Sequence, residues 1–312
     1  ALVGLHTGAL PPWQDVLEPE LARSLEQQSL PLTADKTVSC WPLLSVTLRR
    51  LVAGESAAWN DLNLLGVPLL AQATQGALHP LNWTALALPM ERAFGWTAWL
   101  QAVLAGLFLF ALVRELGCGP LAGLAGGVTF MLGGYLSARW HWYPITGAAL
   151  YLPLALLGIE RLFKGAGAGW MAATALAVSG AFLSGFLQGA VHLCYAGGIW
   201  GLVRLVQGWR AGPHARIVAQ AASVRCAVAL AVGLALAAPQ LLPSLGYVST
   251  GASARDVAEP ELIREVLAMR PVSLVAGLLS AEPFGHPVDL AAHPIPQLAT
   301  RGALRMALCK PM

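Results

Sequence analysis

Charged side chains are scarce in this chain. Asp, Glu, Lys and Arg make up 11% of the 312 residues, hydrophobic residues make up 56%, and the mean hydropathy is +0.62. A soluble domain usually carries about 25% charged residues. No basic run is longer than Arg49-Arg50, so the net charge of +3 is not concentrated into a surface for nucleic acid. The composition excludes an ordinary soluble domain and gives no support to a nucleic-acid partner.

Familiar chemical motifs are also absent from the sequence. It has no Walker loop, dinucleotide glycine fingerprint, H-E-x-x-H or G-x-S-x-G, which argues against nucleotide, zinc-peptidase and serine-hydrolase chemistry. The five cysteines form no C-x-x-C pair, and two of them lie in apolar stretches, so they predict neither a disulfide framework nor a metal site. No obligatory cofactor is predicted. The cysteines are Cys40, Cys118, Cys194, Cys226 and Cys309.

The chain does have six long apolar stretches. Each is about the length that a helix needs to cross a hydrocarbon layer of ~30 Å. Many of their residues are Gly and Ala, which permit close helix–helix contact. The stretches are residues 93–113, 119–138, 144–160, 168–187, 189–203 and 226–245.

The positive charges between these stretches fall almost entirely on alternate sides. Because cytoplasmic loops accumulate Lys and Arg, the side that holds most of them is predicted to be cytoplasmic. Only Arg139 falls on the other side. The predicted fold is an all-α polytopic membrane protein, with 1–91 outside, a helix bundle over 92–245 and an external irregular segment over 246–312. The cytoplasmic connections would carry Arg114, Arg161, Lys164, Arg204, Arg210, Arg216 and Arg225.

The region before the bundle combines a short helix with loop chemistry. Residues 1–10 are apolar but too short to span, so they are either the outer end of a preceding helix or an interfacial segment. Residues 43–52 predict an amphipathic helix closed by Gly54. From Trp59 to Trp83 the chain is rich in Asn, Gly, Pro and Gln, and we expect both indoles to be shielded from water.

Few ionisable residues remain near the predicted outer face. Asp35 precedes the amphipathic helix and could remove a proton from a hydroxyl, although many loop carboxylates are simply solvated. Arg139 and His141, framed by Trp140 and Trp142, suit a phosphate or pyrophosphate; interfacial anchoring of the helix ends is the alternative.

Two further pairs of polar residues allow two interpretations each. Gln188 and His192 lie one helical turn apart, so they either face a cavity or bond to another helix. Asp61 and Asn63 offer oxygen ligands to a divalent cation, but two such residues in a loop are a weak metal signal. On an outer face without ATP, a lipid-linked donor would be the natural energy source for a transfer reaction.

The loop carries a series of short motifs that resembles a known family. Residues 54–60, 66–71, 75–76 and 79–83 follow one another as do the "G-x-x-P-x-W-N-P", "G-x-P-L-x-A", "Q-x-G" and "Y-P-x-N-x" motifs of bacterial YfhO-type membrane proteins. The shared positions include Trp59, Asn60, Gly66, Pro68, Gln75, Pro80 and Asn82. Similar short motifs occur at 133–136, 151–161, 184–188 and 283–287. Departures are the absence of the family's Pro around Trp59-Asn60-Asp61, and Phe186 in place of its His.

This resemblance implies a function. YfhO-type proteins are placed with the GT-C glycosyltransferases, which use polyprenyl-phosphate sugars outside the bacterial cytoplasmic membrane and keep an acidic residue in the first external loop. By resemblance, Asp35 is the candidate general base, and Arg139 and His141 are candidate contacts for the donor phosphate. The predicted partners are then membrane lipid and a polyprenyl-phosphate sugar.

Two other classes remain open. A non-catalytic membrane subunit of a larger complex would use the Gly- and Ala-rich faces to bind other membrane-protein subunits. A transporter is less favoured, because no stretch predicts a buried acidic residue and no inverted repeat is visible.

The orientation can be tested by cysteine accessibility. We expect a Glu55→Cys variant, in a background without the native cysteines, to react with a membrane-impermeant maleimide added outside intact cells. Labelling only after the cytoplasmic side is opened would contradict the predicted orientation.

Overall fold

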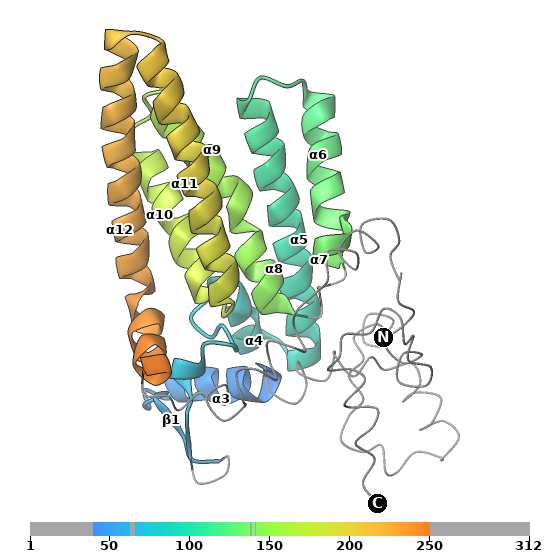
Figure 1. Cartoon of the computed structure of the whole chain (residues 1–312). Helices are drawn as coiled ribbons and strands as arrows, with labels where there is room; N and C mark the ends of the chain where they lie inside the picture. The colour runs from blue at the N-terminus through green and yellow to red at the C-terminus, as the bar shows by residue number, and fades with distance from the viewer. Residues whose placement is uncertain (1–39, 63–65, 138, 141, 250–312) are drawn as a thin grey trace, which may run out of the picture. The chain divides into compact units, whose positions relative to one another are not determined.

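The computed structural model describes residues 40–62, 66–137, 139, 140 and 142–249. Four of the helices found there are long and apolar enough to cross a membrane: residues 92–115, 143–163, 187–210 and 213–249. Figure 1 shows these helices running along one another in a bundle. The described part of the chain is therefore that of a helical membrane protein.

All six apolar stretches are helical. They correspond in order to α5 (Met90–Glu115), α6 (Pro120–Leu132) with α7 (Gly134–Ser137), α8 (Tyr143–Ala149) with α9 (Tyr151–Phe163), α10 (Ala168–Leu183), α11 (Leu187–Arg210) and α12 (Pro213–Ser249). Helices α6 and α10 have 13 and 16 residues, or roughly 20–24 Å, which is short of a full crossing. Six complete crossings therefore stay a prediction.

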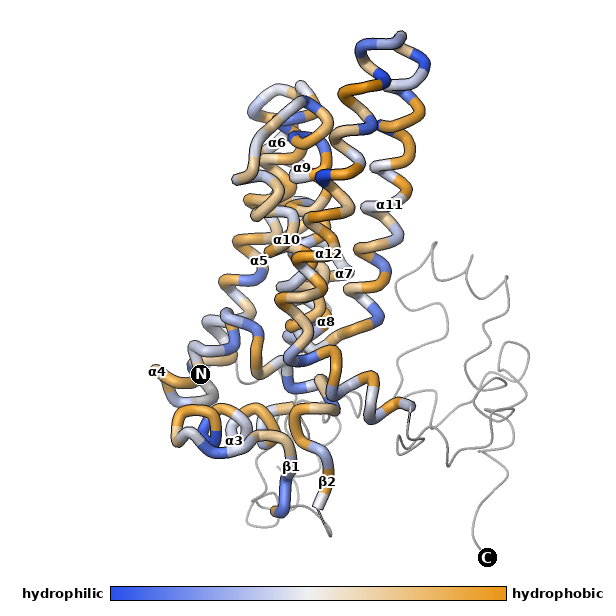
Figure 2. The backbone as a smooth tube through the Cα atoms, turned by 90° about the vertical axis from the view of Figure 1, so that its left-hand side faces the viewer, coloured by the Kyte–Doolittle hydropathy of each residue, from blue (hydrophilic) through white to orange (hydrophobic). Residues whose placement is uncertain are grey.

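The predicted connection between the last two stretches is wrong. Residues 204–225 are helical except for Ala211 and Gly212, so Arg204, Arg216 and Arg225 lie on helices. Gly212 has a φ of 118°, which favours glycine, and Pro213 then begins α12 at a position where a missing N–H costs nothing. The result is a pair of long helices joined by a tight turn. Figure 2 shows hydrophilic residues at this turn.

The antiparallel helices bring the predicted cytoplasmic charges together. One end of the bundle is called the arginine end below. There, Arg161 of α9 and Lys164, which follows α9, bind Glu115 of α5. The Arg225 guanidinium donates to the Ala166 carbonyl at 3.3 Å. The residues before α8, which include Arg139, lie at the opposite end. The charge asymmetry seen in the sequence is thus a real asymmetry of the bundle.

A carboxylate is buried at the arginine end. Glu160 of α9 is 2% exposed, and its Oε1 lies 2.7 Å from Arg204 Nη2 of α11 and 3.5 Å from Lys164 Nζ. The expectation that no apolar stretch holds a buried acid is therefore wrong. The expectation failed because Glu160 is the last residue of the third apolar stretch. Its partner Arg204 lies on α11, which continues beyond the end of the fifth stretch.

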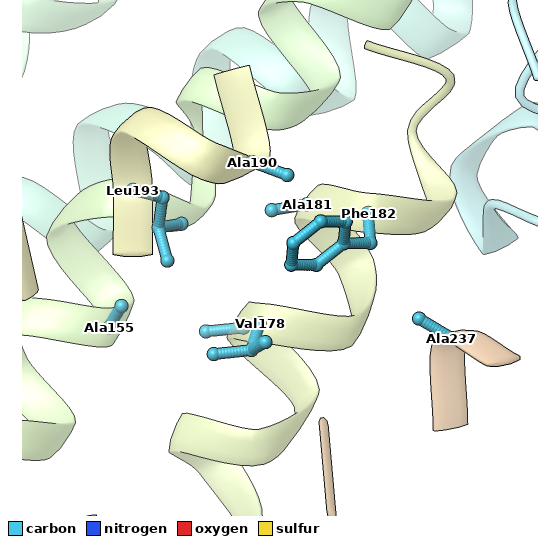
Figure 3. Close-up of a cluster of buried hydrophobic side chains, with 8 residues drawn as sticks. Ala155, Val178, Ala181, Phe182, Ala190, Leu193 and Ala237 are labelled. Atoms are coloured by element: carbon cyan, nitrogen blue, oxygen red, sulfur yellow. The ribbon is translucent and has the colours of Figure 1, made fainter. Parts of the chain in front are cut away.

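Small residues let the helices pack closely. Figure 3 shows Val178, Ala181 and Phe182 of α10 together with Ala190 and Leu193 of α11, and the cluster also includes Ala155 of α9 and Ala237 of α12. Between α5 and α6, a Cβ at Gly127 would lie 2.6 Å from the Gly106 carbonyl oxygen. The Gly- and Ala-rich composition thus serves helix contact, as predicted.

The N-terminal part of the described chain forms a separate layer at the other end of the bundle, here the loop end (Figure 1). Helix α3 (Trp41–Val52) buries Leu43, Leu44 and Leu48 on one face, as the sequence predicted. It is followed by residues 57–83, here the motif loop, which contains a short antiparallel pair and two 3₁₀ turns. The elements are β1 (Trp59–Asn60), β2 (Val67–Pro68), η4 (Leu70–Gln72) and η5 (Pro80–Trp83), and α4 (Thr84–Ala87) follows.

The buried ion pair gives a stability test. Glu160→Gln should destabilise the bundle by about 3–5 kcal/mol, because Arg204 would keep its charge near the protein interior without a carboxylate. The measurement is the free energy of unfolding in detergent. The exposed Glu55→Gln should change it by less than about 0.5 kcal/mol, and equal effects of the two substitutions would contradict the network.

Candidate functional site

The first half of the motif loop is a small hairpin. Trp59 pairs with Pro68 and Asn60 with Val67 in the antiparallel register. Gly66 has a φ of 101°, and a Cβ there would lie 2.2 Å from the Trp59 Nε1 atom. Glycine is therefore required at this position by both backbone and space. The Asn60 side chain is buried and accepts from the Leu62 N–H, so it shapes the turn.

The second half is held by buried side chains that bond to backbone. Gln75 Nε2 donates to the Leu69 carbonyl at 2.8 Å, and Asn82 Nδ2 donates to the Gly76 carbonyl at 2.8 Å. Both side chains are at most 2% exposed. These side-chain amides add to the backbone bonds of the turns, in which the Gly76 carbonyl also accepts from the His79 N–H. Pro80, by contrast, is exposed and begins η5.

Helices of the bundle complete the docking. The Tyr143 hydroxyl of α8 donates to the Gln75 carbonyl at 2.9 Å, and Gln240 Nε2 of α12 donates to the Leu70 carbonyl at 2.7 Å. The backbone of Gly76 also approaches the α10–α11 turn, where a Cβ on Gly185 would lie 2.8 Å from the Gly76 nitrogen. The motif loop is thus tied to three separate parts of the bundle.

His79 is a buried residue of this loop whose role the sequence did not predict. It is fully buried, and its Nε2 lies 3.0 Å from the Tyr151 hydroxyl of α9. Burial lowers the pKa of His79 from 6.5 to about 4, because the cation would lose its hydration. The neutral imidazole therefore serves as a hydrogen-bonding link between loop and bundle.

Helix α3 is anchored beside the start of α8. Cys40, Leu44 and Leu48 share a buried cluster with Phe94 of α5 and Tyr143 of α8. Asp35 lies five residues before Cys40 and is outside the described residues. Cys40, the first residue that the structure describes, thus lies in the Tyr143 cluster.

The Arg139 turn leads into that same cluster. The Arg139 guanidinium lies over the Tyr135 ring, 4.6 Å from its centroid. The backbone carbonyl of Arg139 accepts a hydrogen bond at 2.8 Å from the N–H of Trp142, the residue before Tyr143. Arg139 is half-buried. His141 lies outside the described residues, so its predicted role beside Arg139 stays a prediction.

Other candidates are placed at the surface. Gln188 and His192 of α11 are exposed, and neither donates or accepts a side-chain hydrogen bond among the described residues. Trp59 and Trp83 are 50% and 49% exposed, so the expectation that both indoles are shielded is wrong; the Trp83 N–H still donates to the Ala77 carbonyl.

Asp61 is engaged in an ion pair. Arg50 of α3 binds its carboxylate, and this bond holds the pKa of Asp61 below its usual value. Asn63 is outside the described residues, and within them no group of three or more His, Cys, Asp or Glu is arranged for a metal. The single carboxylate carries no argument for a cation.

Comparison with known proteins gives no further constraint. No family model, curated protein or solved structure matches this chain.

The buried imidazole predicts a pH dependence. Because the folded-state pKa of about 4 lies below the unfolded value of 6.5, the unfolded chain takes up the proton first. Stability should therefore be constant above about pH 6.5 and fall toward pH 4, by at most about 3 kcal/mol from this group. His79→Gln should be less stable at pH 7.5 but should lose this component. Thermal midpoints between pH 4.5 and 7.5 measure it, with the exposed His214→Gln as control; identical pH profiles of wild type and His79→Gln would contradict the assignment.

Proposed function

We propose that this chain is a GT-C-like glycosyltransferase of the bacterial cytoplasmic membrane, which moves a sugar from a polyprenyl phosphate to an acceptor at the cell surface. The proposal rests on the motif resemblance and on one structural observation. Cys40, five residues after Asp35, and Tyr143, four residues after Arg139, share one buried cluster.

The residues of this region have complementary roles. Asp35 accepts the proton of an acceptor hydroxyl, whose oxygen then bonds to the anomeric carbon of the sugar. The bond between that carbon and the phosphate oxygen breaks, and the electron pair leaves with the polyprenyl phosphate. The Arg139 guanidinium, with His141 beside it in sequence, binds the phosphate as its charge develops. The half-buried position of Arg139 strengthens this attraction relative to a fully solvated cation.

The docking of the motif loop has a defined purpose in this mechanism. Gln75 and Asn82 bond within the loop and fix its shape, and the Tyr143 hydroxyl ties the loop to α8. A rigid support is needed because small displacements of reacting groups cost large factors in rate. The motif residues would then act as positioning residues, and the reacting groups would lie in the adjoining segments.

A second function is favoured by the same contacts. A non-catalytic subunit would use the buried amides of Gln75 and Asn82 only to hold its loop, and it would need no reacting group. In that case Asp35 and Arg139 would tolerate substitution, and the exposed apolar faces of helices such as α11 would bind neighbouring subunits.

Isosteric substitution separates the two functions. In membrane vesicles, Asp35→Asn should lower the rate of sugar transfer from a labelled polyprenyl-phosphate sugar by a factor of about 10²–10⁴. The abundance and the thermal midpoint of the protein should not change. Arg139→Gln should weaken donor binding as well as transfer. The matched control is Asp61→Asn, another loop carboxylate, which should retain transfer. Normal transfer by Asp35→Asn would remove this residue from the mechanism and leave the subunit function.

A further inference from the structure

A cavity of about 330 Å³ lies within the bundle near the arginine end. It is lined by α9, α10, α11 and α12, almost entirely with apolar side chains, among them Ile159, Val178, Leu202 and Leu230. Its volume falls in the range of about 300–1,000 Å³ that is usual for ligand sites. The lining residues Leu202 and Leu230 are 60% and 39% exposed, so the cavity opens sideways, toward the lipid, between α11 and α12.

Close contacts of α12 with its neighbours frame the cavity at both ends. Near the turn, a Cβ on Gly208 of α11 would lie 2.5 Å from the Ala219 Cβ of α12. Nearer the loop end, a Cβ on Gly233 of α12 would lie 2.7 Å from the Ala175 carbonyl oxygen of α10. Between these two contacts, Ser223, Cys226, Ala227 and Leu230 of α12 line open space.

Glycines of α11 enlarge this space. Gly198 and Gly201 line the cavity, yet a Cβ built on either would meet no atom within 4 Å. A glycine within a helix costs roughly 0.5–1 kcal/mol relative to alanine. At these positions no close helix contact explains the glycine, unlike at Gly208 and Gly233. The space is therefore available to an occupant from outside the bundle.

The charges at this end identify the occupant. Among the residues that the structure describes, seven cations stand there against two carboxylates, Glu115 and Glu160. Arg225 lies at the rim of the cavity: Ser223 and Cys226 beside it line the space, and its guanidinium reaches Ala166 near Phe163, another lining residue. No carboxylate pairs with Arg225 in the described chain, whereas Arg204 and Lys164 are paired with Glu160. An apolar slot with an unneutralised arginine at its mouth suits a chain with an anionic head.

We propose that the cavity binds one acyl chain of an anionic phospholipid from the cytoplasmic leaflet, with its phosphate at Arg225. The positive-inside pattern makes the arginine end cytoplasmic, where anionic headgroups attract cations next to a helix. The site is independent of the proposed transfer reaction, whose residues lie at the loop end. The bound acyl chain would fill the cavity between α12 and helices α9, α10 and α11 and would stabilise the packing of α12 against them.

Lipid binding by the purified full chain tests this proposal. The probes are phosphatidylglycerol and phosphatidylcholine with identical acyl chains, and a polyprenyl phosphate, each added to detergent-purified protein and quantified by native mass spectrometry and thermal midpoint. Wild type should retain phosphatidylglycerol and gain thermal stability from it. Gly201→Leu, or Gly198→Leu if the first variant is poorly folded, should fill the space and abolish retention, while Gly169→Leu at the exposed start of α10 should not.

The headgroup contact has its own matched pair. Arg225→Gln should weaken phosphatidylglycerol binding about fivefold, the factor expected for one interfacial cation, and should weaken phosphatidylcholine binding less, because the choline cation already neutralises that phosphate. Arg210→Gln removes the same charge from an exposed position at the same end and should have no such effect. Equal losses in the two arginine variants, unchanged binding by the cavity-filling variants, or selective retention of the polyprenyl phosphate would each overturn the proposal.

Discussion

The structure depends on pairing the backbone of an irregular loop at the edge of a hydrophobic bundle. The motif loop has little regular secondary structure, and beside the backbone bonds of its turns it relies on side chains to bond to several of its carbonyls. Gln75, Tyr143 and Gln240 donate to them from the loop itself, from α8 and from α12. Since an unpaired buried group costs about 1–3 kcal/mol, these bonds favour one placement of the loop over any shifted one. The same end of the bundle also holds α3, through the buried cluster that joins it to α5 and α8.

The two ends of the bundle are stabilised by different kinds of interaction. At the loop end, neutral amides and hydroxyls bond to backbone, and the buried His79 stays uncharged. At the arginine end, Glu160 and Glu115 are shared among cations from α9 and α11. A charged network of this kind is sensitive to its composition, because removing one member leaves another unpaired. Among the described residues of the loop end, the buried polar side chains are uncharged, and the Arg50–Asp61 ion pair lies at the surface.

Local patterns in the sequence predicted much of this arrangement. The apolar stretches are helical, residues 43–52 lie in α3 with one face buried, and the cations between the stretches gather at one end. Long-range partners were not predictable: Glu160 is buried by Arg204, which lies 44 residues away on a helix expected to have ended, and His79 meets Tyr151 across 72 residues. Within the candidate site, Arg139 lies at the end of the bundle opposite Arg161, Lys164 and Arg225, as the sequence predicted. The hydrogen bonds of Gln75 and Asn82 could not be predicted, because a sequence motif does not show which backbone carbonyls a side chain will reach.

The central claim is that the segments carrying Asp35 and Arg139 converge at the Tyr143 cluster. The most direct measurement is cross-linking between Asp35→Cys and Arg139→Cys, in a background without the native cysteines, with bismaleimides of graded length. A sugar phosphate can bridge the two residues only over a short span, so reagents of about 10–15 Å should link them efficiently. The pair Asp35→Cys and Gly165→Cys, with the second residue at the arginine end, should not react. Cross-linking of positions 35 and 139 only by much longer reagents, or not at all, would contradict the account.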